Sequence, residues 1–471
     1  MTVVEARERE RVGLEAGERL ESLCDPGSFR PLRSGVLSRR LGGAARPGDG
    51  VLAGAGEVCG RPLFCYAQDP GFMGGSLGEA HADTIVRVMR LAGQAGAPVV
   101  GFVESGGARL QEGHAGLAGY GRIFRASVEL SSRVPQISVV TGVSAGGGSY
   151  SPALTDFVLM TESARMFLTG PRVVREALGE EVTMEGLGGP AVHARNGVCQ
   201  LVAGSDLEAT ELVRELLSHL PQAIGERPPL ADPVPSAGPD PGERVPAESR
   251  RVYDIRDVIE GVVDGRRLLE ISPRWARNMV TGFARIEGRS LGIVANQPRR
   301  LGGVIDAAAS EKAARFIASC DRFGLPLVVL VDTPGFMPGS RQEGAGVIRH
   351  GASLLRAFAA ASVPRLTVVL RKAYGGAVIT MNSKDLGADL VFAWPGAEIG
   401  IMAANQAVGI VHRRRLREAD GKAIHADLAA AYVEEHLTAD AAAASGFIDE
   451  VIDPAQTRGS LAWALASLGR R

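Results

Sequence analysis

Short, continuously apolar runs recur along the first half of the chain. They span residues 99–103, 137–140 and 157–160. Such runs predict strands that are covered on both faces. Before the first run, Ile85 and Met89 lie at helical spacing, which predicts a helix there. The alternation of helix and strand predicts a layered α/β domain.

The second half of the chain repeats this pattern. Its apolar runs are residues 327–331, 366–370 and 390–392. Matched positions in the two halves are separated by 228 to 233 residues, and an ordered series of such matches predicts a duplicated domain. The matched pairs are Gly60-Arg61 with Gly288-Arg289, Gly74-Gly75 with Gly302-Gly303, Pro98 with Pro326, Gln111-Glu112-Gly113 with Gln342-Glu343-Gly344, Val134-Pro135 with Val363-Pro364, Gly146-Gly147 with Gly375-Gly376, and Asp156 with Asp389.

One segment between the two halves does not show this alternation of predicted helices and strands. Seven prolines fall between residues 228 and 246. Proline fixes φ and carries no N–H donor, so helix and central strand are both disfavoured here. We therefore expect an N-terminal domain over residues 1–227, a proline-rich linker over 228–249 and a C-terminal domain over 250–471.

Composition and charge narrow the class of protein. The 471 residues carry 52 Lys+Arg against 53 Asp+Glu, for a net charge of −1. Proteins that bind nucleic acids or membrane surfaces usually carry an excess of basic residues, which this chain does not have. No apolar run approaches the roughly 20 residues of a membrane span, and the first ten residues are too charged for a signal peptide. We expect a cytoplasmic protein.

Each half places a glycine pair directly after a predicted strand. The pairs are Gly146-Gly147 and Gly375-Gly376. Such a turn exposes unpaired N–H groups at the start of the following helix, and glycine lets a ligand oxygen approach them. The pattern favours a site for an anion or a developing oxyanion in each half.

A competing motif overlaps the first turn. Gly142-Val-Ser144-Ala-Gly146 fits the G-x-S-x-G nucleophile elbow of serine hydrolases. Its counterpart in the second half has Ala373 in place of the serine, and no histidine lies in a recognisable triad context. We keep Ser144 as the nucleophile of an alternative hydrolase. No cysteine and histidine spacing predicts a metal site.

Further stretches accompany the two glycine turns. They include Met73-Gly-Gly-Ser-Leu-Gly-Glu79, Ser105-Gly-Gly-Ala-Arg-Leu-Gln-Glu-Gly113, Tyr150-Ser-Pro-Ala-Leu-Thr-Asp156, Ala308-Ala-Ser-Glu-Lys-Ala-Ala-Arg-Phe316, Val331-Asp-Thr-Pro-Gly-Phe336 and Arg371-Lys-Ala-Tyr-Gly-Gly-Ala377. From about residue 25 almost to the end, the chain resembles the carboxyltransferase (β) subunits of biotin-dependent acyl-CoA carboxylases, especially the actinobacterial acetyl-/propionyl-CoA type.

This resemblance implies two tandem, duplicated crotonase-like domains, one for acyl-CoA and one for biotin. Carried over by position, Gly146 and Gly147 hold the thioester oxygen of an enolate. Gly376 and Ala377 are the second catalytic pair and, with Gly375, bind the biotin ureido group. Ser105, Gly106, Gly107, Ala108 and Arg109 form a loop near the acyl-CoA, and Ile379 lines the acyl pocket.

The implied reaction moves CO2 from carboxybiotin to the α-carbon of acetyl-CoA or propionyl-CoA, giving malonyl-CoA or methylmalonyl-CoA. Fatty acid biosynthesis or a polyketide extender pathway would use such products. The resemblance also implies a homohexamer, a trimer of dimers. A partner α subunit must supply biotin carboxylase and biotin carrier domains, because the sequence shows neither. Biotin-linked decarboxylation or transcarboxylation is the open alternative, and we expect no metal.

Overall fold

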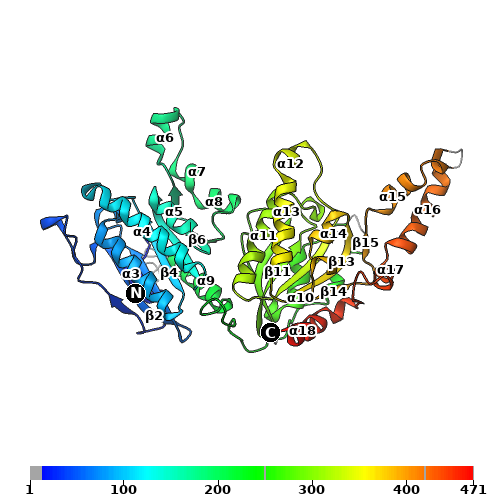
Figure 1. The fold of residues 1–471 in the computed structure, drawn as a ribbon, viewed down its shortest axis with the longest axis horizontal. Coiled ribbons are helices and arrows are strands. Elements are labelled where there is room, and N and C mark those ends of the chain that lie inside the picture. The colour runs from blue at the N-terminus through cyan, green and yellow to red at the C-terminus, as the bar shows by residue number, and fades with distance from the viewer. Residues whose placement is uncertain (1–12, 249–250, 418–420, 470–471) are drawn as a thin grey trace, which may run out of the picture. The chain divides into compact units, whose positions relative to one another are not determined.

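The structure is a computed structural model that describes residues 13–248, 251–417 and 421–469 (Figure 1). The chain separates into two compact units, Met1–Arg227 and Pro228–Arg471, which are called unit 1 and unit 2. Each unit is built on one eight-stranded sheet. In the described parts of the chain, no helix is long and apolar enough to cross a membrane.

The sheet of unit 1 has the strand order β1-β2-β3-β4-β5-β6-β8, and β7 pairs with the end of β5. Strands β1 to β3 pair antiparallel, whereas β3, β4, β5, β6 and β8 run parallel. The strands are β1 (Arg30–Leu32), β2 (Val51–Val58), β3 (Arg61–Gln68), β4 (Val99–Ser105), β5 (Gln136–Ala145), β6 (Phe157–Thr161), β7 (Arg165–Phe167) and β8 (Leu201–Ala203).

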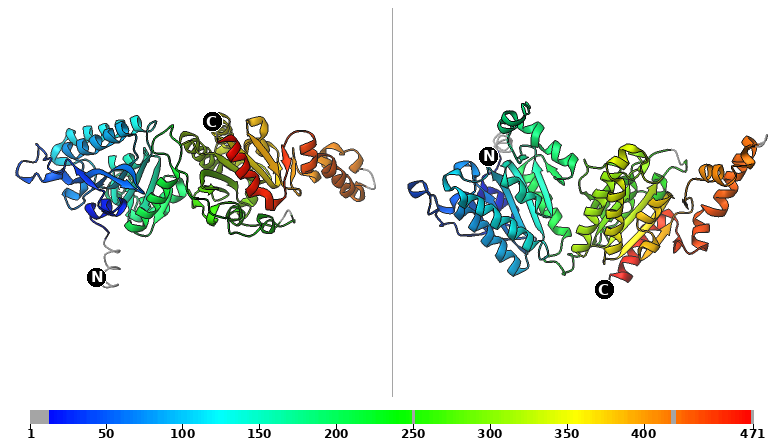
Figure 2. Two further views of the ribbon diagram at one scale, coloured as in Figure 1. Left: turned by 90° about the horizontal axis from the view of Figure 1, so that it is seen from below. Right: turned by 45° about the horizontal axis from the view of Figure 1, so that its top comes forward.

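Helices cover both faces of this sheet (Figure 2). Helices α3 and α4 pack on one face, where Ile85, Met89 and Ile123 belong to one buried cluster. Helices α2 and α9 contact each other and the sheet. The helices are α2 (Ala16–Leu23), α3 (Glu79–Ala95), α4 (His114–Leu130), α5 (Gly147–Ala153), α6 (Pro171–Leu178), α7 (Met184–Gly188), α8 (Pro190–Asn196) and α9 (Asp206–His219).

Unit 2 repeats the topology. Its strand order is β16-β14-β13-β12-β11-β10-β9, and β15 pairs with the end of β13. The strands are β9 (Leu269–Glu270), β10 (Met279–Ile286), β11 (Arg289–Asn296), β12 (Leu327–Thr333), β13 (Arg365–Tyr374), β14 (Leu390–Ala393), β15 (Glu398–Gly400) and β16 (Glu450–Val451). The helices are α10 (Ile255–Val262), α11 (Ala307–Arg322), α12 (Ser340–Gly344), α13 (Val347–Ala360), α14 (Gly376–Thr380), α15 (Ala404–Val411), α16 (Gly421–His436), α17 (Ala439–Ala444) and α18 (Thr457–Leu468).

The strands and helices expected from hydrophobic patterning are confirmed. The six apolar runs fall within β4, β5, β6, β12, β13 and β14, and the helical spacing around Ile85 belongs to α3. The duplication is also confirmed, because both sheets share strand order and direction. The structure adds an antiparallel edge of three strands in each unit, which the apolar runs did not reveal.

The proline-rich segment packs on unit 2. Ala231 N–H donates to the Gly288 carbonyl at 3.0 Å, and Gly265 N–H donates to the Pro235 carbonyl at 3.0 Å. The segment contains one short 3-10 turn, Pro241–Arg244. Its backbone groups are thus partly satisfied by the body of unit 2.

Candidate active site

In unit 1, a glycine turn joins β5 to α5. Gly146 has φ 57° and ψ −123°, in a region that L-residues rarely adopt. Its N–H donates to the Phe167 carbonyl in β7 at 3.1 Å. The next two N–H groups, of Gly147 and Gly148, have no acceptor among the described residues. This corrects the expectation for Gly146, whose N–H is already in use, and leaves Gly147 as the predicted donor.

Unit 2 builds the same turn between β13 and α14. Gly375 has φ 63° and ψ −149°, and its N–H donates to the Gly400 carbonyl in β15 at 2.9 Å. Gly375 therefore cannot also give that N–H to a cofactor. In the described structure, the N–H groups of Gly376 and Ala377 have no acceptor.

A second loop lies beside each turn. Strand β4 pairs with β5 up to Ser105 and Ser144, and β12 pairs with β13 up to Thr333 and Ala373. The loop after each of these strands therefore starts next to the glycine turn.

The two loops share one conformation. Gly107 has φ 101° and donates to the Ser105 hydroxyl at 3.3 Å, and Gly335 has φ 133° and donates to the Thr333 hydroxyl at 3.2 Å. The next N–H groups, of Ala108 and Phe336, lack an acceptor among the described residues. Each unit thus presents two neighbouring segments with unpaired donors. Sequence reasoning missed Phe336, although it matches Ala108 at the repeat offset.

Tyr120 of α4 supports the turn of unit 1. Its ring lies 2.7 Å from where a Cβ on Gly147 would stand, so only glycine fits there. Its hydroxyl and that of Ser105 share a hydrogen bond of 3.1 Å. Burial raises the pKa of Tyr120 to about 12, so it stays neutral at physiological pH. Ser105 is also fully buried, so its hydroxyl holds the loop and does not face a substrate.

Arg109 does not face a substrate either. Its guanidinium is fully buried and contacts Asp49 at 2.6 Å and Glu112 at 2.9 Å. It also donates to the carbonyls of Asp49 and Ser76. Burial raises the pKa of the Asp49 carboxyl, although Arg109 opposes that shift. The resemblance placed Arg109 among the substrate-binding residues of a loop near the acyl-CoA, whereas in the structure its side chain is buried and fixes the loop after β4 from behind.

A cavity of about 550 Å³ opens at the turn of unit 2. Ile379, which the resemblance assigns to the acyl pocket, lines this cavity and is 49% exposed. Glu435 and His436 of α16 also line it, with 3.6 Å between Glu435 Oε1 and His436 Nε2. Sequence reasoning missed both, because no motif connects them to a turn some sixty residues earlier. The lining residues are Gly375, Gly376, Val378, Ile379, Ile399, Gly400, Ile401, Glu435, His436, Ala441, Ala442, Ser445 and Phe447.

A buried polar cluster lies behind the loop of unit 2. Asp332 accepts from Tyr253 at 2.9 Å and from Arg371 at 3.0 Å. Burial raises the pKa of Asp332, and burial also lowers the pKa of Lys372. Next to the glycine turn, Tyr374 hydrogen-bonds Glu398, and burial raises the pKa of this tyrosine. The cluster fixes the end of β13, which carries the turn.

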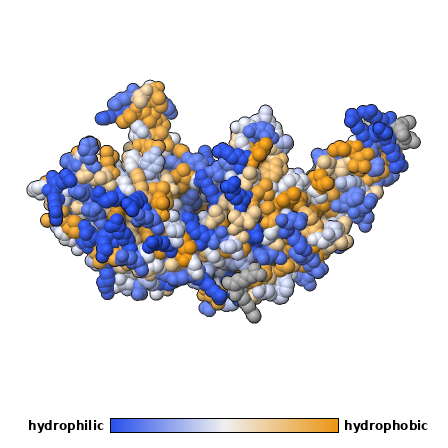
Figure 3. Space-filling view, in the orientation of Figure 1, coloured by the Kyte–Doolittle hydropathy of each residue, from blue (hydrophilic) through white to orange (hydrophobic). Residues whose placement is uncertain are grey.

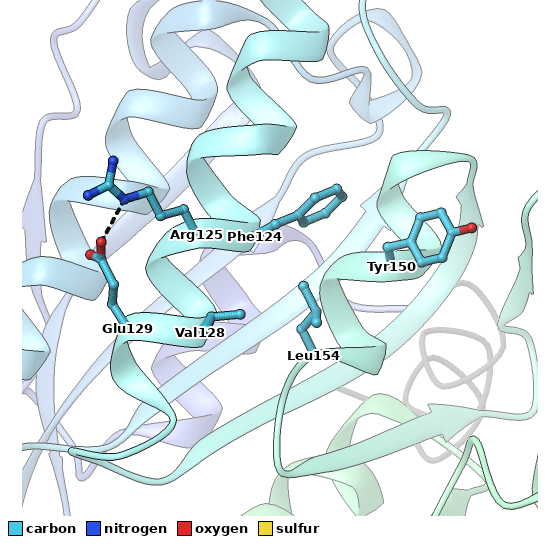
Figure 4. A pocket seen from close by; sticks show the side chains of 6 residues that line it. All are labelled: Phe124, Arg125, Val128, Glu129, Tyr150 and Leu154. Carbon is cyan, nitrogen blue, oxygen red and sulfur yellow. Dashed lines mark hydrogen bonds and ion pairs between the residues drawn. The ribbon is translucent and has the colours of Figure 1, made fainter.

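A second, apolar groove of about 590 Å³ lies between α4 and α5 (Figure 4). Phe124 and Tyr150 meet there edge to face, with ring centroids 6.2 Å apart. Val128 and Leu154 complete the apolar floor, and the Arg125–Glu129 ion pair lies at its rim. The groove contains no glycine N–H donor.

Ser144 does not occupy a nucleophile elbow. It is the second-last residue of β5, two residues before the positive-φ turn, and it is fully buried. Its hydroxyl donates to the Gly148 carbonyl at 2.8 Å. A hydrolase elbow needs an exposed hydroxyl beside a histidine, and the geometry here contradicts that alternative. Among the described residues, no three His, Cys, Asp or Glu side chains are grouped as metal ligands would be.

Comparison with solved structures defines the class of protein. The transcarboxylase 12S hexamer structure with methylmalonyl-coenzyme A bound matches this chain with a TM-score of 0.95 and 44% identity. The match covers 100% of this chain and 91% of that chain. The chain is therefore a protein of two tandem crotonase-like α/β domains.

Sequence comparison then gives the family. The carboxyl transferase domain family matches residues 7–470. The methylmalonyl-CoA carboxyltransferase 12S subunit of Propionibacterium freudenreichii subsp. shermanii is 46% identical, over 96% of this chain and 87% of the relative. The propionyl-CoA carboxylase carboxyltransferase subunit of Haloferax mediterranei is 46% identical, over 97% and 90%. The methylmalonyl-CoA decarboxylase subunit alpha of Veillonella parvula is 45% identical, over 97% and 90%.

The chain belongs to the carboxyl transferase family and is a biotin-dependent acyl-CoA carboxyltransferase. The resemblance seen in the sequence is thereby confirmed.

Replacing Arg109 by Met tests its structural role. The change leaves the Asp49 and Glu112 carboxylates buried without their cation, so the free energy of unfolding should fall by about 3–5 kcal/mol. The KM for acyl-CoA of the folded fraction should stay unchanged. Urea unfolding and steady-state kinetics measure the two quantities. A raised KM at unchanged stability would restore the substrate-binding role.

Replacing Ser144 by Ala should leave carboxyl transfer intact, because the hydroxyl only holds the Gly148 carbonyl. We expect a loss of stability of about 1 kcal/mol, the net value of one hydrogen bond. Ester hydrolysis, measured alongside, should be absent before and after the change. Hydrolysis that disappears with the hydroxyl would contradict this assignment.

Proposed function

We propose that this chain moves a carboxyl group between biotin on a partner protein and the α-carbon of a short acyl-CoA, with propionyl-CoA and methylmalonyl-CoA as the substrate pair. The carrying observation is the duplicated arrangement of unpaired N–H donors at Gly147 and Gly376. The names of the relatives, which act on propionyl-CoA or methylmalonyl-CoA, support this choice. Acetyl-CoA is a second candidate substrate. Its use would give the chain a role in supplying malonyl-CoA for fatty acids or polyketides.

Unit 1 supplies the acyl-CoA side. The N–H groups of Gly147 and Ala108 receive the thioester oxygen as negative charge develops on it during enolate formation. Both are held in place by backbone hydrogen bonds and by Tyr120, so little reorganisation is needed when the charge appears. Losing one such donor costs about 2.7–4 kcal/mol in comparable sites.

Unit 2 supplies the biotin side. The N–H groups of Gly376, Ala377 and Phe336 receive the ureido oxygen. The cavity fits the cofactor, because Ile379, Ile401 and other apolar side chains line it and a Cβ on Gly376 would have no atom within 4 Å. When bound, biotin supplies the transferable carboxyl group and a ureido nitrogen that accepts the α-proton.

The chain itself then contributes position and electrostatic stabilisation. The cavity lining of unit 2 contains two titratable side chains, Glu435 and His436, and neither belongs to a glycine turn. The donors at the two turns are backbone groups, whose protonation does not change with pH. They stabilise the negative charge that develops on the two oxygens.

Decarboxylation is the second candidate for the direction of the reaction. The relative from Veillonella parvula is a decarboxylase subunit, at an identity similar to those of the carboxylase relatives. The same donors stabilise the same enolate in both directions, so the site itself favours neither. The partner that accepts or supplies the biotin then sets the direction.

Assembly into a homohexamer, a trimer of dimers, is part of the proposal, as is a cytoplasmic location. Each unit exposes apolar side chains on projecting helices, visible as orange surface in Figure 3. Leu178 of α6 is 74% exposed, and Ile410 of α15 is 65% exposed. Such surfaces are typical of contacts between copies. A biotin carboxylase and carrier subunit completes the enzyme.

The decisive experiment is carboxyl transfer by the purified chain. Methylmalonyl-CoA and free biotin are the probes, and propionyl-CoA is the product measured by mass. Malonyl-CoA competes in the same tube. Propionyl-CoA formation that requires biotin supports the proposal, and no product from either thioester contradicts it.

Gly376→Val tests the cavity. The added side chain points into open space, so the melting temperature should change little, while transfer should fall by about 100-fold or more. Gly459→Val, in the exposed first turn of α18, is the matched control and should keep full activity. Gly147→Ala is less informative, because its Cβ would collide with Tyr120 and lower stability. Full activity of the Gly376→Val variant would show that this cavity is not the biotin site.

Ile379→Ala tests substrate choice. Ile379 lines the cavity proposed for biotin, and the α-carbon of the acyl group must reach the carboxyl group held there, so removing this exposed side chain enlarges the space around the reacting carbon. The ratio of kcat/KM for ethylmalonyl-CoA to that for methylmalonyl-CoA should rise by about tenfold, the usual scale for one methylene in an apolar pocket. An unchanged ratio would place Ile379 away from the acyl group.

A further inference from the structure

Two loops at one edge of unit 2 carry exposed arginines. One loop precedes β10 and the other follows β11. Asn278 joins them: its carbonyl accepts from Gln297 N–H at 3.0 Å, and its side-chain amide donates to the Val304 carbonyl at 2.8 Å. The four arginines, called the arginine patch, are Arg274, Arg277, Arg299 and Arg300.

The patch borders the proposed biotin site. Ile305 N–H donates to the Gly335 carbonyl at 3.0 Å, and Met337 N–H donates to the Ile305 carbonyl at 2.8 Å. The loop of Arg299 and Arg300 is thereby tied to both sides of Phe336, one of the proposed donors.

The carboxylates of the described residues leave most of the positive charge in the patch uncompensated. Arg299 lies 3.6 Å from Asp254, which also pairs with Arg256 at 3.1 Å. For the other three arginines, no carboxylate partner is found in the described residues. An exposed cluster of this kind attracts an anionic partner over about one Debye length.

The duplication provides an internal comparison. At the same repeat offset, the four positions of unit 1 are Arg46, Asp49, Gly71 and Phe72, so only one of them is a cation. Phe72 is buried and Asp49 is fully buried, whereas their counterparts in unit 2 are exposed arginines. Because basic residues of this chain are almost all arginine, the residue type carries no information. The difference lies in the positions: all four are basic in unit 2, whereas only the first is basic in unit 1.

Hydrogen bonds from a buried lysine fix the conformation of the loop that carries Arg274 and Arg277. The buried ammonium of Lys312 donates to the carbonyls of Ser272, Trp275 and Met279 at 3.0, 3.0 and 2.7 Å. These bonds hold a loop in which Ser272 has φ 55°, a strained value for a residue with a side chain. The patch is therefore presented on a preorganised surface, which lowers the entropy cost of binding.

We infer that the arginine patch docks an acidic face of the biotin-carrying protein. This inference rests on the proposed biotin role of unit 2. A biotin group attached to a macromolecule reaches the site only if that macromolecule binds beside it, and the loop that carries Arg299 and Arg300 is tied to the segment of Phe336, one of the proposed donors. Charge complementarity there speeds encounter and orients the carrier, whereas free biotin needs neither.

The double variant Arg277→Glu/Arg300→Glu tests the inference in the full-length protein. Two acceptors are compared: free biotin, and a biotinylated carrier domain from a propionyl-CoA carboxylase. The KM for the carrier should rise by roughly tenfold, because two attractive contacts become repulsive. The KM and kcat with free biotin should not change. Arg87→Glu/Arg90→Glu, on exposed positions of α3, is the matched control and should behave as wild type.

Salt and direct binding complete the test. Raising NaCl from about 50 to about 300 mM should weaken carrier binding to the wild type, measured by calorimetry, and hardly affect the double variant. Equal carrier affinity in the variant and the control would overturn the inference. A raised KM for the acyl-CoA alone would also overturn it and assign the patch to the phosphates of coenzyme A. If the wild type transfers no carboxyl group even to free biotin, the proposed function fails, while the binding measurement still decides on docking.

Discussion

The structure of the site depends on one hydrogen bond, made twice. A glycine with positive φ gives its N–H to the carbonyl of a short neighbouring strand, Gly146 to Phe167 and Gly375 to Gly400. This bond stops the main strand and points the next residues into a helix whose first N–H groups have nothing to bind within the fold. The donors are unpaired because the strand ends at this turn and a helix begins there. A side chain at either glycine would strain the turn, and the donors would be displaced with it.

The two units differ in the side chains that pack around this shared turn. Glu104 and Asp332 occupy matched positions, and each needs a buried cation. In unit 1 the cation is Arg19 of α2, at 3.1 Å, and in unit 2 it is Arg371 of β13, at 3.0 Å. Gly142, the counterpart of Arg371, has no room for a side chain because Glu104 lies where its Cβ would stand. Both units keep a carboxylate at this position, partly buried in unit 1 and fully buried in unit 2, and a buried arginine from a different element compensates its charge in each.

Much of the fold could be predicted from the sequence, because buried parallel strands leave continuous apolar runs and the repeat doubles the signal. The glycine turns could also be found, since few other residues tolerate positive φ. Which N–H of a turn is unpaired depends on a neighbouring strand that no local pattern reveals, as Gly146 shows. Arg109 was placed in a loop near the acyl-CoA by resemblance to the family, which compares sequence positions and not side-chain packing. Its burial against Asp49 and Glu112 depends on tertiary packing, and so does the position of His436 in the cavity.

Because both turns present the same backbone donors, the donors alone do not distinguish a thioester from a ureido oxygen. The distinction must come from what surrounds each turn. In unit 1, Tyr120 lies under Gly147, and Phe72 and Asp49 are buried at the edge of the unit. At the matched positions of unit 2, a cavity opens at Gly376 and exposed arginines lie at the edge. In the proposed function, the two copies keep one means of stabilising charge and differ in reactant through the side chains around each turn.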